Sequence, residues 1–240
     1  MKNLLRRMLI ALNPEFKFRK QSYAQYGEDM IVFGIFREYL NIHQPSYLDV
    51  GAHHPFHLSN TALFYKFGGA GINIEANPDL IGEFMKHRPK DKNINIGISP
   101  QENALQPFYI MEQPELNTFV KEQAEALAAK GYPIKKVVEI PCYTLEYIVR
   151  SHCNGVFPDF LSLDVEGLDE YILERYDFST SRPKIICVEN LKIDANGRFY
   201  KIEKIREILG QNNYILIADT FLNDIFVDKK LINYAPGGRL

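Results

Sequence analysis

Residues 47–52 read Tyr47-Leu48-Asp49-Val50-Gly51-Ala52, a hydrophobic segment that runs into a carboxylate and then a glycine. Three other hydrophobic segments also run into acidic residues: Gly71-Ile72-Asn73-Ile74-Glu75, Phe160-Leu161-Ser162-Leu163-Asp164-Val165-Glu166-Gly167 and Lys184-Ile185-Ile186-Cys187-Val188-Glu189-Asn190. If these segments are parallel strands of one open sheet, their acids gather at its carboxyl edge, outside which such sheets bind ligands. A row of acceptors at this edge suits a ligand that is rich in hydroxyls and carries positive charge.

The rest of the chain alternates between helix and strand patterns. Apolar residues recur with a helical period in residues 29–40, 57–67, 77–87, 144–152, 169–176 and 200–210, and residues 93–96 alternate as a further strand. Ser59 or Asn60 is expected to cap the second of these helices, and Gly210 the last. Two adjacent strands, 214–219 and 224–228, close the chain as an antiparallel pair. The sequence therefore predicts an α/β fold, a doubly wound and mostly parallel sheet with an antiparallel edge strand.

Length and composition predict one main domain. The 240 residues are 46% hydrophobic and 24% charged, as in a soluble globular protein. We expect a basic segment over residues 1–22 and a single domain over 23–240, in which 106–141 are an insertion or an acceptor-side element. The net charge of −2 argues against a nucleic-acid partner. Three cysteines without a C-x-x-C pair disfavour a disulfide framework and a zinc site, and favour a reducing, cytoplasmic setting.

The first twenty residues differ in charge from the rest. They carry six cations against Glu15 alone, and their apolar residues recur at helical spacing. The apolar run is too short for a signal-peptide core and for a membrane span. One interpretation is a terminal helix packed on the domain or on a partner. The alternative is an interfacial helix that rests on anionic lipid, which would place the protein peripherally at the inner face of the membrane.

The turn after the first strand separates two classes of ligand. A dinucleotide site needs G-x-G-x-x-G to let the backbone approach a pyrophosphate, whereas this turn has one glycine before His53-His54-Pro55. S-adenosylmethionine has no phosphate and offers an ammonium, a sulfonium and a ribose diol, so acids near the turn are useful. Glu75 is well spaced to reach ribose hydroxyls, but NAD uses an acid there too. The missing glycines favour S-adenosylmethionine over a nicotinamide oxidoreductase.

Several motifs together resemble the FkbM family of S-adenosylmethionine-dependent methyltransferases. They are Tyr47-Leu48-Asp49-Val50-Gly51-Ala52-His53, Asn73-Ile74-Glu75-Ala76-Asn77-Pro78, Ser162-Leu163-Asp164-Val165-Glu166-Gly167-Leu168-Asp169 with Val188-Glu189, the lead-in Ser22-x-x-Gln25-x-Gly27-Glu28-Asp29, and the tail Asp219-x-x-x-Asn223-Asp224-Ile225-Phe226. The resemblance implies a Rossmann-like methyltransferase fold and O-methylation, often of sugars or polyketide-like hydroxyls. The family commonly has Asn-x-Gly where this chain has His53-His54-Pro55.

We assign the candidate site residues to two ligands. The cofactor set is Asp49, Gly51, Ala52, His53, Asn60, Glu75, Ala76, Gly97 and Asp164. The catalytic set is Asp164, Glu166 and Glu189, with His53, His54 or His57 as a base. Asp164 and Glu166 are two apart at a strand end and therefore point to the same side. The alternatives are helix capping and surface salt bridges for the acids, and structural hydrogen bonding for each histidine.

Two further roles follow from residue type. Asp164, Glu166, Glu189 and Asn190 offer the oxygen ligands that Mg²⁺ or Mn²⁺ prefers. Gln25, Glu28, Asp29 and His57 are candidates for a lid or for acceptor binding, although Asp29 could equally cap the next helix.

The functional hypothesis is transfer of a methyl group to a hydroxyl of a sugar, glycan or glycolipid intermediate. The alternatives are an NAD-type oxidoreductase and a non-catalytic S-adenosylmethionine-binding module. A nucleic-acid amino-methyltransferase is disfavoured, because no [DNS]-P-P-[FYW] motif follows Asp164.

Overall fold

The structure is a computed structural model that describes Glu15 and residues 19–101, 104–193 and 198–232. Residues 1–14 and 16–18 of the basic segment lie outside the described residues, so both interpretations of it, a packed terminal helix and an interfacial helix, stay predictions. Within the described ranges, none of the helices has the length and apolar character needed to cross a bilayer.

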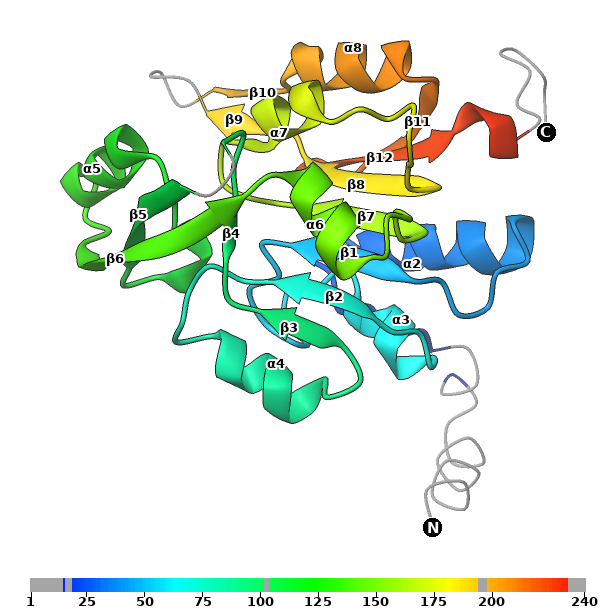
Figure 1. Ribbon diagram of the computed structural model, residues 1–240, viewed down its shortest axis with the longest axis horizontal. Coiled ribbons are helices and arrows are strands. Elements are labelled where there is room, and N and C mark those ends of the chain that lie inside the picture. Colours follow the sequence, from blue (N-terminus) through cyan, green and yellow to red (C-terminus); the bar gives the residue numbers. More distant parts are fainter. Residues whose placement is uncertain (1–14, 16–18, 102–103, 194–197, 233–240) are drawn as a thin grey trace.

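A central sheet organises the chain, in the order β11-β12-β8-β7-β1-β2-β3. Its strands are β1 Tyr47–Val50, β2 Gly71–Ile74, β3 Lys92–Ile94, β7 Phe160–Leu163, β8 Ile185–Glu189, β11 Tyr214–Asp219 and β12 Asn223–Asp228. Figure 1 shows it from β11 and β12 at the top to β3 at the bottom. The predicted fold class is confirmed: β1, β2, β3, β7 and β8 pair in parallel, and the final hairpin is antiparallel. The reversed strand β12 lies second from the edge, because β11 pairs along its outer side.

Helices cover both faces of this sheet. On one face lie α2 Glu28–Gly34, its π-helical continuation η2 Ile35–Tyr39, and α3 Ala62–Lys66; on the other lie α6 Leu145–His152, α7 Asp169–Arg175 and α8 Glu203–Gln211. Side chains alternate along β1, so Leu48 and Val50 pack with the α6–α8 face. Tyr47 packs with Phe64 on the α2–α3 face. By the same alternation, the side chain of Asp49 points to the α2–α3 face, as that of Tyr47 does.

Three helices begin or end differently from the prediction. Residues 57–61 form bends before α3, although Ser59 Oγ does accept the Ala62 N–H as predicted for a cap. The helix α4, Ile81–His87, begins four residues late, after a turn in which Asn77 accepts the Asp79 N–H through its side chain and the Leu80 N–H through its carbonyl. Gly210 lies inside α8 instead of ending it.

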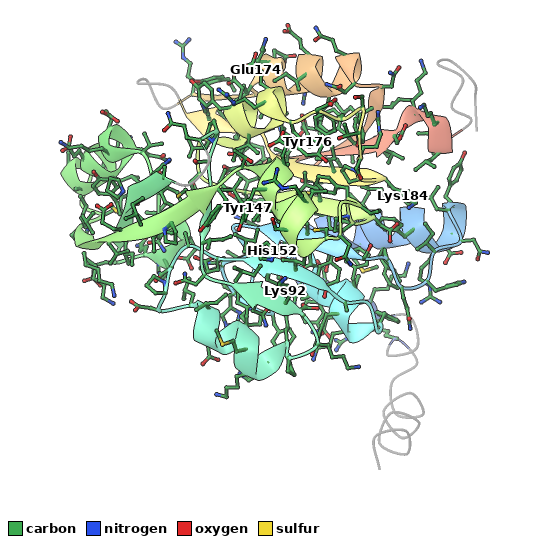
Figure 2. All side chains as sticks on the ribbon, viewed as in Figure 1. Lys92, Tyr147, His152, Glu174, Tyr176 and Lys184 are labelled. Atoms are coloured by element: carbon green, nitrogen blue, oxygen red, sulfur yellow. The ribbon has the colours of Figure 1, made fainter. Side chains whose placement is uncertain are left out.

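The predicted insertion forms a separate three-stranded sheet. The strands of this sheet are β4 Gly97–Ile98, β5 Ala104–Met111 and β6 Ile134–Tyr143, and the helices η3 Pro114–Leu116 and α5 Lys121–Ala129 lie between β5 and β6 in the chain. The insertion is drawn at the left of Figure 1. A hairpin, β9 Lys192–Ile193 with β10 Phe199–Tyr200, and a short helix η4 Lys229–Leu231 complete the fold. Figure 2 shows Tyr147 and His152 of α6 near Lys92, which begins the edge strand β3.

Candidate active site

A cavity of about 300 Å³ lies at the carboxyl ends of the parallel strands. The sheet contributes Val50, Gly51, Ile74, Glu75, Asp164 and Glu189 to its walls. The insertion contributes Phe108, Phe119 and the segment 114–117. Its volume is at the lower end of the range for small-molecule sites. The four strand ends that the sequence singled out therefore meet at one cavity, which is partly apolar and partly acidic.

Gly51 brings the ends of β1 and β7 into contact. Its φ is +76°, and a Cβ built there would lie 1.7 Å from the carbonyl oxygen of Asp164. The N–H groups of Gly51 and Ala52 both donate to the Ile74 carbonyl, each at 3.0 Å. Only glycine fits such a turn, which lets the backbone of Asp164 approach the end of β1 at the cavity wall.

Glu75 is a buried acid at the end of β2, 5% exposed. Its Oε2 accepts the His53 N–H at 2.8 Å, and its Oε1 accepts the Asn77 N–H at 2.7 Å. Burial, with a smaller contribution from the charge of Asp49, raises the pKa of Glu75 to about 7. Each carboxylate oxygen keeps acceptor capacity for a ligand hydroxyl.

Three acids form a close group on the other side of the cavity, which we call the carboxylate trio: Asp164, Glu166 and Glu189. Each contributes one oxygen, and these oxygens lie within 4.8 Å of one another. Within the described part of the chain, Asp164 Oδ1 is buried without a hydrogen-bond partner. Burial, then the charges of neighbouring acids, raises the pKa of Asp164 to about 7 and those of Glu166 and Glu189 well above their usual range. The trio is therefore prepared to take up a proton or a cation.

Asp169 holds the loop that carries Glu166, a role the sequence interpretation missed. It accepts the N–H groups of Val165 and Gly167, each at 3.2 Å, and is buried. Glu166 is fixed in the left-handed region with φ of +54°. A signal was present in the acid two residues after Gly167, because a short acidic side chain there can bind the backbone of its own turn.

Some predicted cofactor residues lie beneath the cavity rather than in its wall. Asp49 shares the face of Tyr47, opposite to Val50, and accepts a short hydrogen bond from Thr61 Oγ1. Asn60 donates to Ser162 Oγ at 3.2 Å, and Ala52 packs with Ile81 and Phe84. The structure places Gly51, His53, Glu75, Ala76, Gly97 and Asp164 in the wall, as expected for that set.

Of the three predicted site histidines, one lines the cavity and two do not. His53 lines the cavity in the left-handed region, with Nε2 3.8 Å from Glu115 Oε1, and burial lowers its pKa. His54 Nδ1 accepts the N–H groups of Phe56 and His57 at 3.1 and 3.0 Å, so His54 has the structural role that was its alternative. Neither His54 nor His57 lines the cavity.

The predicted lid and metal residues are only partly brought to the site. Gln25 lines the cavity, whereas Asp29 binds Ser22 Oγ and the Tyr23 N–H. Glu28 is fully buried and does not line the cavity; it binds Thr220 and the cavity-lining Asn223. Asn190 lies apart from the trio, because its amide binds Asp224 and the Ile202 N–H.

The comparisons with known proteins agree with this geometry. The methyltransferase FkbM domain matches residues 49–216. Among curated proteins, none has a sequence that matches this chain. A TehB-like S-adenosylmethionine-dependent methyltransferase from Corynebacterium glutamicum is 10% identical, with 93% of this chain and 97% of that one covered, at a TM-score of 0.44.

Two further solved structures match this chain over most of its length. Monomeric WbdD is 14% identical over 90% of this chain at a TM-score of 0.42, but the match spans only 44% of WbdD. Magnesium protoporphyrin IX methyltransferase from Synechocystis, solved with S-adenosylmethionine, is 12% identical over 87% of this chain and 85% of that one, at a TM-score of 0.34. The assignment rests on the family match and the strand order rather than on these low scores.

The strand order and the cavity at the carboxyl edge define a Rossmann-like methyltransferase. Since the family match covers most of the chain, the protein belongs to the FkbM methyltransferase family. It is an S-adenosylmethionine-dependent methyltransferase. The nicotinamide oxidoreductase alternative is thereby set aside.

Proposed function

We propose that this enzyme methylates a hydroxyl group of a sugar, glycan or glycolipid intermediate. The observation that carries the proposal is the carboxylate trio at the cavity wall, in which the buried Asp164 Oδ1 has no hydrogen-bond partner among the described residues. A hydroxyl is a poor nucleophile and must lose its proton during transfer. An amine that attacks as the free base does not need several carboxylates beside it, so the trio favours oxygen as the acceptor atom.

The residues of the cavity fit S-adenosylmethionine. Glu75 offers acceptors to the ribose hydroxyls. The apolar walls, which include Ile74, Ile96 and Phe119, suit the adenine ring. The cofactor supplies a methyl carbon activated by the adjacent sulfonium. The chain then has two tasks, to hold the hydroxyl in line with that carbon and to take its proton, and both fall to the trio.

The test of the proposed function is transfer of label to an acceptor. Purified enzyme is incubated with methyl-labelled S-adenosylmethionine and separate glycan, lipid, protein and nucleic-acid fractions of cells, and labelled products are analysed by mass spectrometry. We expect label in glycan or glycolipid as a methyl ether. Label confined to nitrogen, or to protein or nucleic acid, would contradict the proposal.

Cofactor affinity is expected to depend on pH through Glu75. Its pKa of about 7 means that the carboxylate is ionised at pH 8 and largely protonated at pH 6. Because the ionised form is the better acceptor for ribose hydroxyls, the Kd for S-adenosylmethionine should rise by up to about tenfold from pH 8 to pH 6. Calorimetric titration at both values measures this change. In Glu75→Gln the rise should be shallower, and an equally steep rise would show that another group titrates.

We also propose that the trio holds Mg²⁺ or Mn²⁺ during catalysis. The ion would relieve the repulsion among three carboxylates and supply positive charge where the hydroxyl loses its proton. Exhaustive EDTA treatment and dialysis should lower the transfer rate at least tenfold, and Mg²⁺ or Mn²⁺ should restore it. Unchanged activity after that treatment would eliminate the ion and leave the trio as a proton acceptor.

A further inference from the structure

Two exposed aromatic side chains, Tyr26 and Phe199, each contact the exposed ring of Phe221, although the three residues come from distant parts of the chain. Tyr26 is 53% exposed, Phe199 57% and Phe221 49%. The ring centroids of Tyr26 and Phe221 lie 6.1 Å apart, and those of Phe199 and Phe221 lie 5.4 Å apart; both pairs have T-shaped geometry. We call these residues the aromatic platform. Exposed apolar groups of this kind usually mark a binding surface when they are contiguous.

The buried acid Glu28 fixes two parts of this platform. Its Oε2 accepts the Tyr26 N–H at 2.9 Å. Its Oε1 accepts from Thr220 Oγ1 at 2.7 Å and from Asn223 Nδ2 at 2.9 Å, on either side of Phe221. A fully buried carboxylate is costly unless its hydrogen bonds are made. The chain thus uses such a group to hold Tyr26 and the β11–β12 turn together.

Phe221 itself is held in a backbone conformation that bulky residues avoid. Its φ is +76°. The turn is closed by a 3.0 Å bond from the Phe221 N–H to Asp219 Oδ1 and a 2.9 Å bond from the Thr220 N–H to the Asn223 carbonyl. Glycine or asparagine would adopt this backbone conformation with less strain than phenylalanine. We therefore attribute the phenylalanine at this position to its aromatic ring. Strained positions of this type often belong to ligand sites.

Sequence neighbours of the platform residues line the catalytic cavity. Gln25 precedes Tyr26, and Leu222 and Asn223 follow Phe221; all three line the cavity together with the trio. A ligand that reaches from the platform to the trio needs an apolar face at one end and hydroxyl groups at the other. An acyl chain or a flat aromatic acceptor can pack on the platform but offers few hydroxyl donors to the trio. A pyranose offers both, because it has a face of C–H groups and an edge of hydroxyls.

We propose that the aromatic platform is the acceptor subsite, which stacks on the C–H face of a pyranose ring and presents its hydroxyl edge to the trio. The inference rests on the proposed function and narrows it to a carbohydrate acceptor bound through its ring. The platform contributes to binding of the acceptor, whereas Gly51 and Glu75 contribute to binding of the cofactor.

The experiment is steady-state transfer at saturating S-adenosylmethionine, with a panel of methyl hexopyranosides, methyl 6-deoxyhexopyranosides and the labelled glycan fraction as acceptors. The variants are Phe221→Gly, which relieves the backbone strain, and Phe199→Ala. The matched control is Tyr39→Ala, which removes a 57% exposed aromatic residue of η2 outside the platform. We expect each platform variant to raise the acceptor KM about tenfold or more, with kcat and the Kd for S-adenosylmethionine changed less than threefold. The control should keep the KM of the natural chain.

The outcomes separate this inference from the proposed function. If the natural chain methylates carbohydrate and the platform variants keep its KM, the platform inference is overturned and the proposed function stands. If the natural chain methylates no carbohydrate but does methylate an acyl or aromatic hydroxyl, the platform inference and the proposed function are both overturned. A fall in kcat alone, or a loss of cofactor binding in the variants, would also overturn the platform as an acceptor subsite.

Discussion

Asp164→Asn lowers the rate of methyl transfer by about 10²- to 10⁴-fold, the range expected for loss of a proton acceptor. The asparagine amide cannot take the proton of the hydroxyl, and its NH₂ group would occupy the centre of the trio. The measurement is a single-turnover rate with enzyme-bound labelled S-adenosylmethionine and the glycan fraction that the natural chain methylates. The Kd for the cofactor should change by no more than about tenfold, because Glu75 and the apolar walls remain.

The control for Asp164→Asn is Glu174→Gln, which removes an exposed acid of α7 that pairs with Lys204 on the protein surface (Figure 2). An exposed pair of this kind contributes little to stability, so its rate should match that of the natural chain. The Tm of Asp164→Asn at pH 8 should be no lower than that of the natural chain, because the substitution relieves repulsion with Glu166 and Glu189. A rate within threefold of the natural chain would refute the catalytic role of Asp164.

Gly51→Ala should abolish measurable binding of S-adenosylmethionine, which corresponds to at least a 100-fold rise in Kd. The new methyl group would lie 1.7 Å from the Asp164 carbonyl oxygen, and the φ of +76° is unfavourable for alanine. The turn between β1 and β2 must therefore move, and Asp164 with it. Calorimetric titration measures the binding, and circular dichroism shows whether the sheet remains folded.

Gly82→Ala is the matched control for this substitution. Gly82 lies in α4, and a Cβ there meets no atom within 4 Å. Alanine in a helix is favoured over glycine by about 0.5–1 kcal/mol, so the control should bind the cofactor normally and be slightly more stable. Normal binding by Gly51→Ala would mean that the close approach of β1 and β7 is not part of the cofactor site.

The strand ends were the part of the site that the sequence could predict. Parallel strands place their carboxyl ends at one edge, so Glu75, Asp164 and Glu189 were expected together and are together. The face to which each side chain points was harder to predict. Asp49 lies one residue before the Val50 that lines the cavity, and the alternation of β1 turns it beneath the wall.

The contributions of distant segments could not be predicted. Phe108 and Phe119 reach the cavity only because the insertion folds back over the sheet edge. Glu28 resembles a lid residue in its motif, yet it binds Thr220 and Asn223, which follow it by more than 190 residues. Contacts of this kind depend on tertiary packing, which leaves no periodic pattern in the sequence.

The central claim is that these strand ends form one cofactor site, and calorimetric titration of S-adenosylmethionine into the natural chain at pH 8 tests it most directly. The account predicts one binding event per chain, a Kd about 10- to 100-fold weaker in Glu75→Gln, and no heat in Gly51→Ala. Absence of binding heat in the natural chain, or affinity unaffected by both substitutions, would contradict it.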